Sequence, residues 1–244
     1  MVCPDAHHPY VDQLAWKTFL AAARVVKPDV MVIIGDFADC YAVSSHAKDP
    51  GRKSKLKAEL EAVNEALDEI EELGISRVEF CEGNHETRIT RFVASEASAL
   101  YGMLDVSELL RIEARGWGWT PYNDFLKIGK VLFTHDVGRC GVNTARQSLQ
   151  DVGGNIVVGH SHRAALVYQG TTAGEQHFGL NVGWLGDIDS IDYQHKARAR
   201  RDWQHAFGLI DQKADGFAWA QLVPILDGNC VVYGTPVSGR SRSR

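Results

Sequence analysis

Five short fragments of the chain combine carboxylate or amide oxygens with histidine nitrogens. In chain order they are Asp5-Ala6-His7, Gly35-Asp36-Phe37-Ala38-Asp39, Gly83-Asn84-His85-Glu86, Thr134-His135 and Gly159-His160-Ser161-His162. Such side chains hold divalent metal ions and transfer protons in enzymes. A metal-dependent reaction is the chemistry that this collection would support.

Each fragment also has an ordinary structural interpretation. A lone His135 after a strand more often packs in the core than binds a metal, Asp36 alone would cap the following loop, and Asn84 would supply a left-handed turn. The fragments occur together by chance in on the order of one in a million chains of this length. Taken together, they favour one site over a set of unrelated structural roles.

The donor atoms themselves limit the kind of metal site. Two aspartates, one asparagine and four histidines are too many ligands for one tetrahedral zinc ion, but they suit two divalent ions that share a bridging carboxylate. Because no thiolate belongs to the set, Mn, Fe, Zn, Co and Ni are all suitable, and Ca less so. Two ions about 3.5 to 4 Å apart lower the pKa of a bridging water and hold both oxygens of an in-line displacement.

In its order along residues 5–162, this series resembles that of the calcineurin-like metallophosphoesterases. The resemblance implies an α/β fold, a four-layer α/β/β/α sandwich, and two divalent transition-metal ions, with Mn as the first candidate. It assigns three residues to the first ion, three to the second and one to a bridging position. These are Asp5, His7 and His162 for the first ion, Asn84, His135 and His160 for the second, and Asp36 as the bridge.

The resemblance also implies catalytic residues outside the metal ligands. His85 would contact the phosphate and protonate the leaving group, while Asp39 would orient its imidazole and raise its pKa. The sequence departs from the protein Ser/Thr phosphatases at Cys40, where those enzymes carry an arginine, and this argues against a phosphoprotein phosphatase. Arg88 or Arg139 would partly replace that phosphate ligand, unless both are solvated surface arginines.

The pattern of elements alternates buried strands with amphipathic helices. We expect helices at 12–26 (with Asp12 as N-cap), at 55–73 and over most of 87–115. Expected strands are 30–34, 78–81, 125–128, 130–133, 155–158, 165–169, 176–182, 207–210, 218–225 and 231–233. Polar motifs follow directly after several of these strands, where sites form in layered α/β folds.

Length and composition favour one metallophosphoesterase domain over residues 1–237, followed by a disordered Ser/Arg tail at 238–244. Only four residues precede Asp5, where family members usually have a full buried strand. Either this strand is very short or the natural chain begins further upstream, and we favour the second interpretation. Five scattered cysteines, no secretory signal and no apolar run of membrane-spanning length indicate a cytoplasmic protein that is not held in a membrane. The sequence implies no protein partner.

The leading functional interpretation is a phosphodiesterase that acts on nucleotides or nucleic acid. One alternative is a phosphomonoesterase of broad range, and another is a non-catalytic interaction module, although such modules usually lack a ligand and none is missing here. The net charge of -5 gives no general attraction for nucleic acid. Two basic stretches, 42–57 and 196–201 with Trp203, would attract a polyanion, although solvated surface is the preferred interpretation of both.

Overall fold

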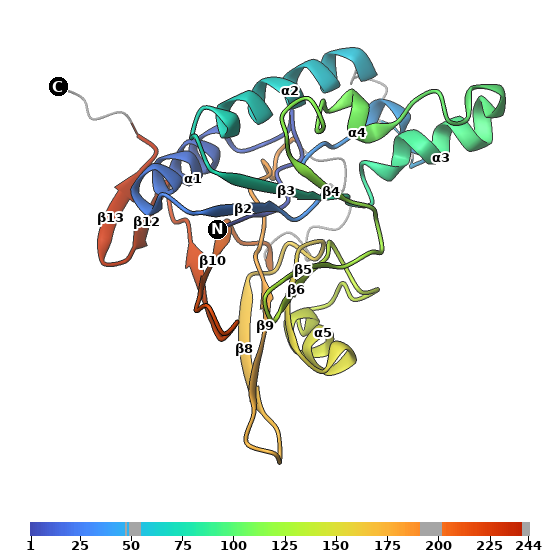
Figure 1. The fold of residues 1–244 in the computed structure, drawn as a ribbon. Helices are drawn as coiled ribbons and strands as arrows, with labels where there is room; N and C mark the ends of the chain where they lie inside the picture. Colours follow the sequence, from blue (N-terminus) through green and yellow to red (C-terminus); the bar gives the residue numbers. More distant parts are fainter. Residues whose placement is uncertain (47, 49–54, 191–201, 241–244) are drawn as a thin grey trace.

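Two β-sheets lie face to face, with helices on their outer sides (Figure 1). The computed structural model describes residues 1–46, 48, 55–190 and 202–240. Within these residues, one sheet has the order β11 (Ala218–Pro224), β10 (Ala206–Gln212), β1 (Val2–Cys3), β2 (Val30–Ile33), β3 (Arg77–Cys81) and β4 (Gly118–Thr120). The other has the order β5 (Leu126–Ile128), β6 (Val131–Phe133), β7 (Asn155–Val158), β9 (Gln176–Asn181) and β8 (Ala165–Gly170).

The helices form the two outer layers. α1 (Gln13–Val26) and α2 (Leu56–Glu71) lie over the first sheet, with α3 (Thr87–Glu96) and α4 (Val106–Leu109) beyond its β4 edge (Figure 1). α5 (Thr144–Val152) covers the second sheet. The hairpin of β12 (Asn229–Val232) and β13 (Thr235–Ser238) packs on α1, and two short 3-10 helices, η1 (Tyr41–Val43) and η2 (Ser98–Leu100), lie in loops.

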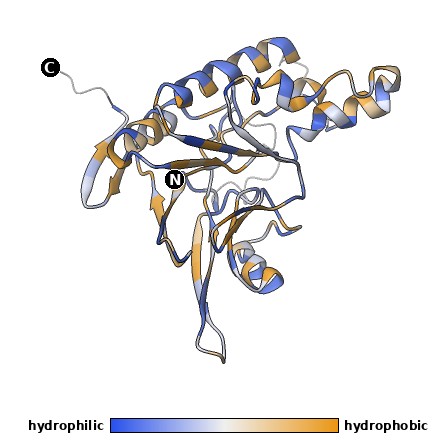
Figure 2. Ribbon diagram, in the orientation of Figure 1, coloured by the Kyte–Doolittle hydropathy of each residue, from blue (hydrophilic) through white to orange (hydrophobic). Residues whose placement is uncertain are grey.

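Alternating side chains of the central strands fill the spaces between these layers. In β2, Met31 and Ile33 join the core beneath the helices, whereas Val32 and the following Ile34 face the second sheet. β7 alternates in the same way between the opposite sheet and α5. Strands buried on both faces need continuous apolar runs, and β2 is correspondingly hydrophobic in Figure 2. The predicted four-layer α/β/β/α sandwich is confirmed.

The first two long helices begin and end close to the predicted limits. Asp12 caps α1, since its Oδ1 accepts hydrogen bonds from the backbone N–H of Leu14 (2.9 Å) and Ala15 (2.8 Å). Beyond α2, Gly74 adopts a φ of 66°, which only glycine adopts without strain. None of the helices in the described ranges is long and apolar enough to cross a membrane. All five cysteines are free thiols, as their scattered spacing indicates.

Several elements differ from the sequence expectations. The strand before Asp5 is present as β1, but it has only two residues, which lie between β2 and β10. β4, α5 and β13 were not predicted from the sequence. The expected boundary after residue 237 falls inside β13, because Ser238 pairs with Asn229 and the N–H of Gly239 donates to Gly228 O (3.0 Å). Residues 241–244 lie outside the described part of the chain.

The topology brings the polar fragments to one place. β1, β2 and β3 are parallel neighbours, as are β6, β7 and β9. The carboxyl ends of parallel strands share one edge of a sheet, so the segments that follow them converge. Five of these segments carry the predicted ligands.

Candidate metal centre

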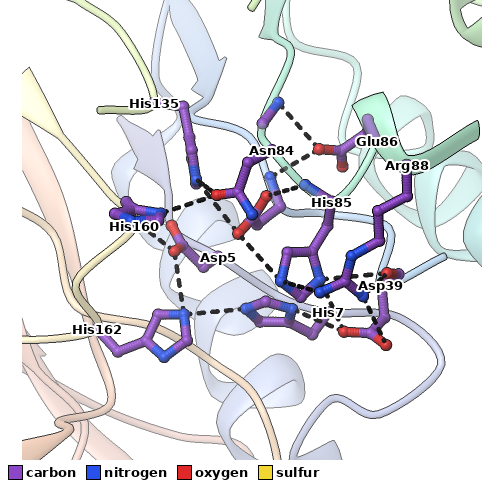
Figure 3. Close-up of polar contacts among 12 residues, drawn as sticks. Asp5, His7, Asp39, Asn84, His85, Glu86, Arg88, His135, His160 and His162 are labelled. Atoms are coloured by element: carbon purple, nitrogen blue, oxygen red, sulfur yellow. Dashed lines mark hydrogen bonds and ion pairs between the residues drawn. The ribbon is translucent and has the colours of Figure 1, made fainter. Parts of the chain in front are cut away.

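The seven predicted metal ligands meet between the two sheets (Figure 3). Three segments of the first sheet and two of the second supply them, each just after its strand. They are Asp5 and His7 after β1, Asp36 after β2, Asn84 after β3, His135 after β6, and His160 and His162 after β7. Most of these side chains are buried, so the donor atoms are shielded from bulk water.

The first group of donors consists of Asp5, His7, Asp36 and His162, whose candidate ligand atoms all lie within 4.8 Å of one another. The Nε2 atoms of His7 and His162 are 3.0 Å apart, and His162 Nε2 is 3.3 Å from Asp5 Oδ2. Among the described residues, the buried Asp5 Oδ1 and His162 Nδ1 have no hydrogen-bond partner. Nitrogen and oxygen donors that converge in this way fit a bound cation.

The second group consists of Asp36, His135 and His160. Asn84 joins it, since its Oδ1 lies 3.1 Å from His135 Nε2 and 2.8 Å from His160 Nδ1. Asp36 Oδ2 is 3.2 Å from His135 Nε2. Because Asp36 belongs to both groups, it is the carboxylate that would bridge two ions. The mixed oxygen and nitrogen donors suit divalent transition metals.

The charges inside the cluster are strongly coupled. Burial opposes ionisation of Asp36, but electrostatic interaction with the imidazoles of His135 and His85 outweighs it and holds the pKa of Asp36 well below its usual value. Burial likewise opposes protonation of His135, but Asp36 raises the pKa of His135 to about 10. Burial lowers the pKa of His162 to about 4, so this imidazole is a neutral donor near pH 7. Metal ligation requires neutral imidazoles, so a cation would take the place of the proton on His135.

The family of the chain follows from its sequence as well. A sequence model described as calcineurin-like phosphoesterase matches residues 1–210. The chain belongs to this family. It is 26% identical over 249 residues to the Gene 54 protein of Mycobacterium phage D29, and 25% identical over 251 residues to that of Mycobacterium phage L5, with 96% of each chain covered in both cases. The protein is therefore a phosphoesterase, and members of its family typically bind two divalent ions.

The ligand loops of this phosphoesterase have an unusual backbone. His7, Asp36, His160 and His162 adopt positive φ values between 46° and 65°. Non-glycine residues reach this left-handed region at a cost of about 1 to 3 kcal/mol each, and mostly at functional sites. Hydrogen bonds across the site hold the loops in place: Asp36 O, for example, accepts from the N–H of His7 (2.9 Å).

Glu86 connects the loops that follow β2 and β3. Its buried carboxylate accepts backbone hydrogen bonds from Gly83 (2.9 Å), Asp36 (3.0 Å) and Ala38 (2.8 Å). The two loops approach so closely that a Cβ on Gly83 would overlap the backbone nitrogen of Asp36. Burial and the neighbouring Asp36 raise the pKa of Glu86 to about 7. Glu86 stood in the third motif without an assigned role, and its position beside His85 was the only signal in the sequence.

His85 lies beside the ligands and contacts Asp39 and Arg88 (Figure 3). Its Nδ1 is 2.9 Å from Asp39 Oδ1, and its Nε2 is 2.8 Å from Arg88 Nη2. Both contacts are satisfied if Nδ1–H donates to Asp39 and Nε2 accepts from Arg88. The expected rise in the pKa of His85 is wrong: burial lowers it and outweighs the carboxylates of Asp36 and Asp39, which raise it. Asp39 also contacts His7 Nδ1 at 3.1 Å.

The two candidate substrate arginines occupy different places. Arg88 projects from α3 into the cluster, where Nη1 also donates to Asp39 O (2.8 Å). Arg139 does not join the cluster in the structure. Its exposed guanidinium pairs with Asp151 of α5, with Nε 2.8 Å from Oδ2. The placement therefore favours Arg88 over Arg139 as a residue that contacts substrate.

Two tryptophans line the side of the centre formed by His162. Trp184 is buried and stacks on the His162 ring with the ring centroids 5.0 Å apart, so it packs in the core and also forms a wall of the site. Trp203 packs edge-on against the same ring at 4.4 Å. No sequence signal marked Trp203 as part of the centre. Asn181, the last residue of β9, donates to Ser161 Oγ (2.6 Å) and thereby supports the loop between His160 and His162.

Residues 47 and 49–54 of the first basic stretch, and the whole of the second stretch at 196–201, lie outside the described residues. In the first stretch, Lys57 is exposed and lies 3.7 Å from Glu61, one turn further along α2. Lys48 Nζ donates to Ala42 O (2.6 Å). Lys57 thus behaves as a solvated helix residue, which was the preferred interpretation.

Proposed function

We propose that this phosphoesterase hydrolyses phosphodiesters, and that its substrates are nucleotides or nucleic acid. The observation that carries the proposal is the engagement of Arg88, whose two Nη atoms contact Asp39 O and His85 Nε2. Cys40, which follows Asp39 and stands where the protein Ser/Thr phosphatases carry an arginine, is a buried thiol and offers no positive charge to a phosphate. A monoester has two ionisable oxygens and benefits most from a guanidinium with both nitrogens free, whereas a diester has a single charge.

The proposed cofactor is a pair of divalent transition-metal ions, with Mn as the first candidate and Fe, Zn, Co and Ni as others. Two such ions supply a nucleophilic water at neutral pH and neutralise charge on the phosphoryl group. Each ion would have three ligands of its own, and the two ions would share one carboxylate. We assign Asp5, His7 and His162 to one ion, Asn84, His135 and His160 to the other, and Asp36 to both.

His85 is the proposed acid for the leaving group. Its Nε2 lies 3.7 Å from Asp36 Oδ2, so it faces the metal ligands, while Asp39 fixes the opposite side of the ring. For His85 to act as an acid, its Nε2 must be free of Arg88 and must first take up a proton from water. The imidazolium would then give this Nε2 proton to the departing oxygen, while Nδ1–H stays hydrogen-bonded to Asp39.

A diester and a monoester with the same chromogenic leaving group test this proposal. With the manganese-loaded protein, we expect a higher kcat/KM for the diester. The Asp36→Asn variant serves as a control, because any activity that persists in it comes from a contaminant. A clear preference for the monoester would instead establish a broad-range phosphomonoesterase, the alternative function.

A further inference from the structure

A cavity of about 320 Å³ opens beside the metal centre, between α3 and the loop that follows η1. Asn84 lines it and is also a proposed ligand, so the cavity and the metal centre share a wall. Arg88, Arg91, Phe92 and Ser95 line the cavity from α3. A substrate whose phosphate lies at the metal ligands would extend its remaining atoms into this space.

α3 presents two different faces. Ile89 and Val93 are buried and attach the helix to the domain, whereas the side chain of Phe92 is 41% exposed and lines the cavity. Helical spacing places Phe92 about one turn beyond Arg88, roughly 5.4 Å further from the metal centre. An exposed phenyl ring on the wall of a cavity is a surface on which a nucleobase stacks.

Arg91 adds positive charge at the same level of the helix. Its guanidinium lies over the ring of Tyr122, 6.0 Å from the ring centroid, and none of the ion pairs found among the described residues engages it. Arg91 is exposed, so it is available to a second phosphate. Ser95 and Glu96, at the end of the helix, also line the cavity and offer hydrogen-bonding groups to the edge of a base.

We infer that this cavity binds the nucleotide next to the scissile phosphate of a nucleic-acid strand, with its base on Phe92 and its further phosphate on Arg91. The inference rests on the proposed function, because it concerns the same site, and it makes substrate choice depend on α3. Stacking of one base on an aromatic ring contributes enough binding free energy to change the affinity at least about five-fold.

Phe92→Ala tests the inference with a dinucleotide diester and a chromogenic diester that has no base. We expect kcat/KM for the dinucleotide to fall at least about five-fold, mainly through KM, with little change for the chromogenic diester. Phe92→Trp should restore the dinucleotide activity. Phe217→Ala is the matched control, because Phe217 is similarly exposed (47%) but lies just before β11, outside this cavity.

Arg91→Gln tests the phosphate part separately. In the wild-type protein, we expect a higher kcat/KM for a dinucleotide with a terminal phosphate than for the same dinucleotide without one. In the variant, this difference in kcat/KM should disappear. Equal losses on substrates with and without a base, or no loss in either variant, would overturn the inference. If the wild-type protein prefers monoesters, the same variants are compared on a nucleoside monophosphate and a chromogenic monoester. This comparison tests nucleotide binding in the cavity even where the proposed diester preference is wrong.

Discussion

Asp36 is the residue through which the two donor groups are connected. It lies in both groups of candidate ligands, and the N–H of His85 donates to its Oδ1 (2.8 Å). A neutral amide at this position keeps the shape of the side chain but removes the charge that balances two cations. The change therefore affects both ions rather than one.

Asp36→Asn should weaken metal binding at both positions together. We expect close to two ions per wild-type chain after reconstitution and a clear loss of both in the variant, measured by elemental analysis. Asp215→Asn, at the exposed turn between β10 and β11, is the control and should keep both ions. Retention of both ions by Asp36→Asn would show that another residue bridges them.

His85 gives a second prediction at this scale. His85→Ala should keep its metals, because no ligand of either group is changed, and should lose about 10²- to 10⁴-fold in kcat. Substrates with good leaving groups need little protonation, so the loss should shrink for them. Kinetics with a series of leaving groups, alongside metal analysis, measures both effects. Loss of metal in this variant would place His85 among the ligands.

At the residue scale, the sequence identified which side chains meet but not how they are engaged. The seven candidate ligands were predictable because each follows a strand within a recognisable motif. The role of Glu86 was not, since its three backbone hydrogen bonds depend on the close approach of two loops. The pKa of His85 was predicted in the wrong direction because the extent of burial is not visible in a motif.

At the scale of elements, helices and strands with a long or continuous hydrophobic pattern were predicted from the sequence, whereas short elements were missed. The apolar run 30–34 and the amphipathic helix α2 were recognised because each pattern is long or continuous. β4 has three residues and lies at a sheet edge, and α5 is a short, mostly polar helix, so neither gives a clear pattern. Missing α5 matters more for the fold, because this helix is the outer layer that covers the second sheet.

The start of α1 provides a prediction for an element. Asp12 accepts two hydrogen bonds from the first turn of the helix, and its own N–H donates to Leu185 O (2.8 Å). Asp12→Ala should lower the free energy of unfolding by about 0.5 to 2 kcal/mol, measured by denaturant titration. Asp12→Asn retains the capping oxygen and should stay near the wild-type value. Equal losses in both variants would show that the negative charge, not the cap, stabilises the helix.

At the scale of the whole molecule, the candidate metal ligands come from both sheets. Asp5, Asp36 and Asn84 follow strands of the first sheet, whereas His135 and His160 follow strands of the second. Ions bound by both sets oppose separation of the sheets. Binding to the folded state alone stabilises it in proportion to the logarithm of ligand concentration.

Metal removal should therefore lower the Tm of the protein. At a free metal concentration about 1,000 times Kd, each ion contributes on the order of 4 kcal/mol. Thermal unfolding of chelator-treated protein, followed by titration with Mn²⁺, measures the effect. Asp36→Asn should have a much smaller response to added metal, and a wild-type Tm that does not change with metal would contradict the joining role.

The position of β1 between β2 and β10 affects when the enzyme is completed during synthesis. The strand that leads to Asp5 is made long before one of its two neighbours, β10, which ends at Gln212. Asp5 is also held by Leu185, whose N–H donates to Asp5 O (2.7 Å). A nascent chain that has left the ribosome only as far as residue 162 thus contains every candidate ligand but lacks β10, the strand that pairs with the one before Asp5. Activity is expected to appear only when most of the chain has left the ribosome.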